Sequence, residues 1–158
     1  MKGLTDRIIH FFGNQGFVIV STIDKNGRPH SSCKGIVQIQ KEGRIYLFDL
    51  YKAGTYKNLQ SNTNISITAV DEHKFEGYCL KGKARIVAGG TLNPQTIKAW
   101  EEKIAGRITK RMVRNIREDK AVTRHSEALL PRPQYLIMMG VEEIVDLIPQ
   151  NLRRAKNG

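Results

Sequence analysis

The fold is decided by residues 17–48, FVIVSTIDKNGRPHSSCKGIVQIQKEGRIYLF. Phe17–Ile23 is rich in β-branched residues and predicts a strand. The following Asp24–Gly27 is a strong turn signal, because Asn-Gly tolerates positive φ at little steric cost. A second strand is expected from about His30 to Gln40, and after another tight turn a third from Arg44 to Phe48. Three strands joined by two tight turns predict an antiparallel meander.

The segments around this meander extend the same pattern. Leu4–Phe12 has apolar residues at helical spacing and predicts a short amphipathic helix. The polar stretch Lys52–Asn62 predicts a loop that leads into a short helix, and Ile65–Val70 and Tyr78–Val87 predict two further strands. Five strands with short turns in roughly the first 90 residues favour a small barrel over a parallel sheet.

The second half predicts a long helix and a last β segment. Asn93 and Pro94 are a typical helix start, and apolar residues then recur at steps of three and four, which predicts a helix over about 94–117. These apolar residues are Ile97, Trp100, Ile104, Ile108, Met112 and Ile116. Gly106 leaves open whether this helix is unbroken. Gln134–Leu147 predicts either a strand pair or one long strand bent around Gly140.

Length and composition favour a single domain. The chain has 158 residues, 40% of them hydrophobic, so we expect one domain over 1–150 and a basic tail over 151–158. It has no apolar run of about 20 residues and no signal-peptide pattern at its start, so a cytoplasmic location is expected. Cys33 and Cys79 fit a reducing compartment, and the scattered histidines predict no metal site.

The charge is strongly basic. The 26 Lys and Arg outnumber the 15 Asp and Glu, a formal net charge of +11, which attracts nucleic acid, an anionic membrane face or a phosphorylated ligand. The basic segment from Lys98 to Arg124 predicts a solvated helix face, with contact to a phosphorylated substrate or to a nucleic-acid backbone as the alternatives. Against nucleic acid, the chain has no zinc-finger spacing and no recognisable helix-turn-helix, and aromatic residues make up only 7%.

A phosphate site is one interpretation of two neighbouring segments. Ser32 and Lys34 share one face of the second strand, and Lys52, Thr55, Lys57 and Asn58 follow the third. Hydroxyls, ammonium groups and backbone N–H groups at a helix start suit a phosphate dianion. A solvated turn with ordinary lysines is the alternative. The chain carries no P-loop, dinucleotide-binding or hydrolase motif, so catalytic residues stay unassigned and a cofactor would supply any reactivity.

The segment from Phe17 to Val87 resembles the pyridoxamine-5′-phosphate-oxidase-like, FMN-binding split-barrel family. The resemblance rests on the order of STIDKNGRPHSSCKGI, GRIYLFDLYKAGTYKNLQSN, ISITAV and EGYCLKGKARIV. It implies a mainly β fold, a six-stranded antiparallel split β-barrel of Greek-key type with added helices. It also implies a homodimer with FMN at the interface. The residues that it implies for binding FMN are Ser32, Lys34, Lys52, Thr55, Tyr56, Lys57 and Asn58, with Phe48 and Asp49 near the ring or ribityl chain.

The chain departs from this family at two positions. Ser32 and Gly54 stand where many relatives have basic residues, and we expect Lys34 and Lys52 to supply that charge. The substrate-binding arginine and histidine of the vitamin B6 enzyme have no clear counterpart near the C-terminus, so that activity is not expected. The resemblance implies an FMN-dependent oxidoreductase with an unknown small substrate. The alternatives are a split barrel that binds F420 or haem, a non-catalytic flavin-binding module and, last, a nucleic-acid-binding protein.

Overall fold

A computed structural model describes residues 1–49, 52–88, 94–117 and 135–149. The elements are the helices α1 (Asp6–Gly13), α2 (Gly54–Ser61) and α3 (Pro94–Arg117), and the strands β1 (Val18–Ile23), β2 (Pro29–Ile39), β3 (Arg44–Phe48), β4 (Asn64–Asp71), β5 (Glu76–Ala88) and β6 (Tyr135–Asp146). Each expected helix and strand is present, and the last β segment is one strand rather than a pair. The expected tail over 151–158 lies outside the described residues.

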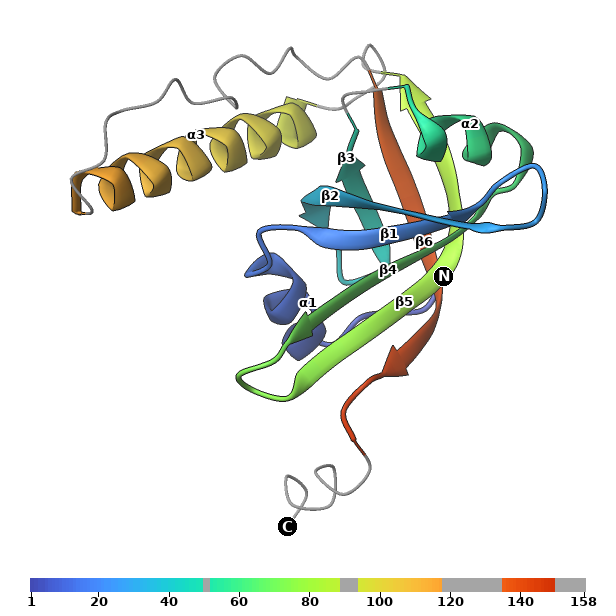
Figure 1. The fold of residues 1–158 in the computed structure, drawn as a ribbon, viewed down its shortest axis with the longest axis horizontal. Coiled ribbons are helices and arrows are strands. Elements are labelled where there is room, and N and C mark those ends of the chain that lie inside the picture. Colours follow the sequence, from blue (N-terminus) through green and yellow to red (C-terminus); the bar gives the residue numbers. More distant parts are fainter. Residues whose placement is uncertain (50–51, 89–93, 118–134, 150–158) are drawn as a thin grey trace.

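The six strands close into one antiparallel barrel (Figure 1). Their order is β1-β2-β3-β6-β5-β4, so β6 enters between β3 and β5 and completes the ring. Its register pairs Met139 with Ile45 on β3 and with Ala84 on β5. The structure confirms the expected mainly β, six-stranded split-barrel fold.

Two glycines are required by the backbone of the barrel. Gly27 has φ +76° in the turn between β1 and β2, where Asp24 Oδ1 accepts hydrogen bonds from the amides of Asn26 and Arg28. Gly82 lies where the register of β5 and β6 shifts, and a Cβ there would collide with the carbonyl of Gly140. The backbones of β5 and β6 therefore approach closely at this bulge.

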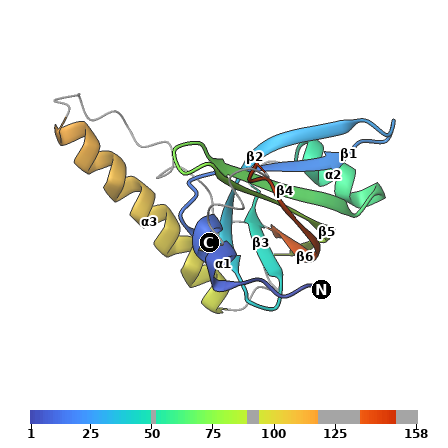
Figure 2. The ribbon, with the colours of Figure 1, turned by 90° about the horizontal axis from the view of Figure 1, so that it is seen from below.

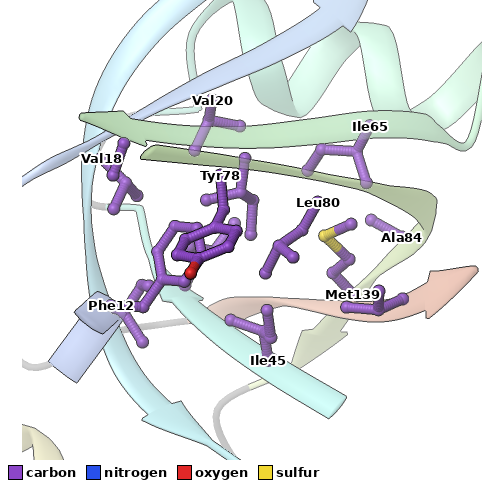
Figure 3. Close-up of a cluster of buried hydrophobic side chains, with 14 of the residues drawn as sticks. Phe12, Val18, Val20, Ile45, Ile65, Tyr78, Leu80, Ala84 and Met139 are labelled. Carbon is purple, nitrogen blue, oxygen red and sulfur yellow. The ribbon is translucent and has the colours of Figure 1, made fainter. Parts of the chain in front are cut away.

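The barrel is filled by the inward side chains of its strands, and α1 closes one end (Figure 3). Phe12 of α1 is 0% exposed, and Phe11 meets both Phe12 and Tyr78 edge-on, with ring centroids 5.3 and 5.1 Å apart. The aromatic side chains of α1 and β5 therefore make this end of the core apolar.

The helix α2 covers the other end of the barrel (Figures 1 and 2). It contacts β1, β2 and β5. Its side chain Leu59 is buried in the core. Asn58 of the same helix donates through Nδ2 to Thr22 Oγ1 on β1 at 3.0 Å, with both side chains buried. A polar contact therefore fixes α2 to the barrel beside an apolar one.

The helix α3 packs on the outer face of the barrel through its N-terminal part. Trp100 is buried against Val37 and Leu136, and its ring stacks on Phe48 with centroids 5.7 Å apart. The helix continues past Gly106 without a break, and its C-terminal end projects away from the barrel (Figure 2). No helix among the described residues is long and apolar enough to cross a membrane.

Candidate functional site

The first side chains of the candidate site lie on β2, where successive side chains alternate in orientation. His30, Ser32 and Lys34 are half-buried or buried, whereas Ser31 and Cys33 are exposed. The three follow the same alternation as the core residues of the strand, so they lie on its inward side. The expected shared face of Ser32 and Lys34 is confirmed.

These side chains belong to a group that we call the polar layer, which lies beneath α2. Because β1, β2, β3 and β6 are neighbours in the barrel, their inward residues meet here although they are far apart in the sequence. The strands contribute Thr22, His30, Ser32, Lys34, Asp49 and Tyr135, and α2 contributes Thr55, Tyr56 and Asn58. Six of the nine expected cofactor residues are in this layer.

A buried ion pair joins two of the expected residues. Lys34 Nζ donates to Asp49 Oδ1 at 2.8 Å, and the two side chains are 9% and 5% exposed. Removing either partner would leave an uncompensated charge in the barrel. The charge of Lys34 is therefore balanced within the chain and is not a free cation for a phosphate.

Tyr135 lies beside this ion pair, on β6, the strand that neighbours β3 in the barrel. Phe48 and Leu136 are partners across β3 and β6, which sets Asp49 and Tyr135 opposite each other at the next position. Burial, followed by the hydrogen-bonding interaction with Asp49 and the charge of that carboxylate, raises the pKa of the Tyr135 hydroxyl well above its usual value. Apart from this interaction between them, neither the Tyr135 hydroxyl nor Asp49 Oδ2 has a hydrogen-bond partner in the described part of the chain.

The start of α2 has no side-chain cap. Ala53 stands at the N-cap position and offers no side-chain acceptor, although its carbonyl accepts from the amide of Lys57. The first-turn amides of a helix have no partner within the helix. The hydroxyls of Ser32 and Thr55 lie 3.0 Å apart at this place and tie β2 to the helix start. Two hydroxyls and a helix N-terminus together suit an anionic group.

His30 is a site residue that the sequence analysis missed. Its ring lies against Gly54, the first residue of α2, because a Cβ at Gly54 would be 2.7 Å from both Cε1 and Nε2 of the imidazole. The two residues lie on elements that are not adjacent in the chain. Only the missing side chain at Gly54, noted as a departure from the family, gave a signal in the sequence.

Three of the expected residues lie apart from this layer. Phe48 points to the outer face of β3, where it stacks on Trp100. Lys52 is exposed, with its Nζ 5.6 Å from the centroid of the Tyr56 ring, and Lys57 is exposed on α2. The two lysines remain near the helix start, whereas the contacts of Phe48 fix it against α3.

A separate groove of about 370 Å³ lies over β1, β4, β5 and β6. It shares only Thr22 with the polar layer, and none of the nine expected cofactor residues lines it. No cluster of three metal-ligating side chains occurs among the residues that the structure describes.

The barrel with α2 over a polar layer defines the chain as a small protein of the split-barrel class. Residues 4–126 match the family described as pyridoxamine 5′-phosphate oxidase, and the chain belongs to this family. The search of curated proteins found no match.

Solved structures share the fold at low sequence identity. HupZ from Group A Streptococcus superposes with a TM-score of 0.65 at 20% identity, over 92% of this chain and 94% of that one. A putative pyridoxamine 5′-phosphate oxidase from Lactobacillus delbrueckii superposes with a TM-score of 0.61 at 15% identity, over 90% of this chain and 93% of that one. HutZ, a haem storage protein from Vibrio cholerae, superposes with a TM-score of 0.52 at 16% identity, over 91% of this chain and 94% of that one.

Proposed function

We propose that this protein binds FMN at the α2 end of the barrel and acts as an FMN-dependent oxidoreductase. The observation that carries the proposal is the meeting of Ser32 and Thr55 at the uncapped start of α2. Hydroxyls and free backbone amides are the donors that a phosphate monoester needs. Membership of the pyridoxamine 5′-phosphate oxidase family supports the choice of a flavin.

The residues present fit this cofactor. Bound FMN would supply two-electron chemistry, and the chain would bind and orient it. Ser32, Thr55 and the first amides of α2 would donate to the phosphate, while the bond from Asn58 to Thr22 holds α2 in place. Asp49 and Tyr135 offer unpaired polar atoms to the ribityl hydroxyls.

An absorption spectrum of the protein purified without added cofactor, and again after incubation with FMN and removal of the excess, tests the proposal. We expect flavin bands that stay with the protein. A protein that stays colourless and does not retain FMN would contradict the proposal.

The phosphate contacts are tested by comparing FMN with riboflavin. Thr55→Ala combined with Lys52→Ala should weaken FMN binding about tenfold or more, because a hydrogen bond to a charged group is lost, and should leave riboflavin binding unchanged. Thr68→Ala with Lys74→Ala, on β4 and in the turn after it, is the matched control and should change neither. Equal losses for both flavins in the Thr55 and Lys52 variant would mean that these residues do not contact the phosphate.

The proposal includes a homodimer with the flavin at the interface. Two large apolar side chains are exposed, Phe17 before β1 and Ile19 on it. A second copy would cover such a surface and enclose a flavin at the polar layer. Dilution to the monomer, followed by sedimentation and flavin absorbance, should release the cofactor. A monomer that keeps its flavin would refute this geometry.

Haem is a second candidate ligand. The fold similarity to a haem storage protein and the half-buried imidazole of His30 at the α2 end favour it. A His imidazole is a usual axial ligand of haem iron. A Soret band in the purified protein that His30→Ala shifts or abolishes would support haem, whereas flavin bands alone would reject it.

A further inference from the structure

The start of α2 contacts a nitrogen-bearing side chain that belongs to β2, the imidazole of His30. Lys34 is already paired with Asp49, and Lys52 is exposed beside the Tyr56 ring. Gly54 has no side chain, yet the space that its side chain would occupy is filled by the His30 ring. The helix start therefore carries a nitrogen-bearing side chain that comes from a different element.

We infer that His30 is the residue that decides the preference of this site for a phosphorylated ligand, supplying from β2 a donor that residue 54 does not supply. An imidazole N–H donates a hydrogen bond, and in its protonated form it also adds a positive charge. The ring stands at the first residue of α2, and the next residue, Thr55, meets the Ser32 hydroxyl. The inference rests on the proposed flavin site and adds the residue that separates FMN from riboflavin.

The ligand is indicated independently of the helix start. Asp49 Oδ2 and the Tyr135 hydroxyl are buried and, apart from the interaction of these two side chains with each other, have no hydrogen-bond partner in the described residues, and each side chain is 5% exposed. Tyr135 meets Tyr56, in the first turn of α2, edge-on at 4.9 Å between ring centroids. Buried polar atoms without partners are rare in proteins, so their presence under α2 marks a place that a bound polar molecule completes.

The position of the His30 ring requires a glycine at residue 54. Because a Cβ at residue 54 would lie 2.7 Å from two ring atoms of His30, any side chain there displaces the imidazole. A small residue at 54 and a histidine at 30 therefore belong together. An arginine at 54 would need a small residue at 30, and it would bring its own donors to the helix start.

Equilibrium binding of FMN and of riboflavin, followed by flavin fluorescence, tests the inference. His30→Ala should weaken FMN binding about tenfold to a hundredfold, as expected for losing a hydrogen bond to a charged group, and leave riboflavin binding unchanged. Gly54→Ala keeps the imidazole but displaces it, and should weaken FMN binding in the same direction. His73→Ala, in the exposed turn after β4, is the matched histidine control and should change neither affinity.

The double variant His30→Ala with Gly54→Arg completes the test. The arginine enters the space that the imidazole leaves, so we expect the preference for FMN to return. Circular dichroism and thermal unfolding verify that each variant folds. If the wild-type protein prefers FMN and His30→Ala keeps that preference, the inference about His30 is wrong and the proposed function stands. If the wild-type protein binds neither flavin, both are wrong.

Discussion

The two helices that close the ends of the barrel begin in different ways. Thr5 caps α1, and its Oγ1 accepts from the amide of Ile8 at 3.4 Å, whereas Ala53 gives α2 no side-chain cap. α1 buries Phe11 and Phe12 in the core, and α2 instead presents polar side chains to the polar layer. The α1 end has the features of a stabilising contact, and the α2 end has a helix start without a side-chain cap.

The difference indicates that the α1 end mainly stabilises the fold, whereas the α2 end is suited to binding a ligand. An apolar cluster and a capped helix contribute free energy of folding without any ligand. A buried ion pair, two unpartnered polar atoms and an uncapped helix contribute little or cost stability. Such features are retained where a ligand uses them, which is why the α2 end is the better place to look for function.

The largest effect is expected at the α1 end. Phe12 is 0% exposed, so Phe12→Ala should lower the free energy of unfolding by about 3–5 kcal/mol through lost apolar burial and a cavity. Phe75→Ala, at an exposed phenylalanine in the turn between β4 and β5, is the control and should cost less than about 0.5 kcal/mol. Urea unfolding measures both. Similar losses for the two variants would mean that α1 does not hold this end of the core.

Two tyrosines, one at each end, give the next largest effect. Tyr78 donates to Glu76 Oε1 at 3.2 Å near α1, whereas the hydroxyl of Tyr135 has no partner in the described residues besides the adjacent Asp49. Tyr78→Phe should therefore cost about 1.5–3 kcal/mol, and Tyr135→Phe should cost less than this in the free protein. Urea unfolding at neutral pH compares them. A larger loss for Tyr135→Phe would show that its hydroxyl is already satisfied without a ligand.

Local sequence patterns predicted most of the fold. β-branched runs between tight turns indicated the first five strands, and the alternation along β2 placed Ser32 and Lys34 on one side. The helix starts at Asn93-Pro94 and after Lys52 were also recognisable from their local residues. These features depend on neighbours within a few residues, and such patterns are the ones that a sequence carries directly.

The contacts that complete the site depend on how the barrel closes. Lys34 meets Asp49 only through the register of β2 and β3, and Tyr135 joins them only because β6 enters beside β3. No local pattern indicates which strand will be the neighbour of β3. The contact of His30 with Gly54 likewise depends on where α2 lies on the barrel, so it was visible only in the structure.

The smallest effect concerns the caps themselves and links the two ends. Ala53→Ser adds an acceptor for the first amides of α2 and should stabilise the free protein by about 0.5–1 kcal/mol. The same serine would compete with a phosphate for those amides, so FMN affinity should fall while riboflavin affinity stays the same. Thr5→Ala at α1 should lower stability by about 1 kcal/mol and leave FMN affinity unchanged. Thermal unfolding and fluorescence titration of the two variants measure both quantities. A stabilised Ala53→Ser protein that still binds FMN with unchanged affinity would mean that the phosphate does not use the start of α2.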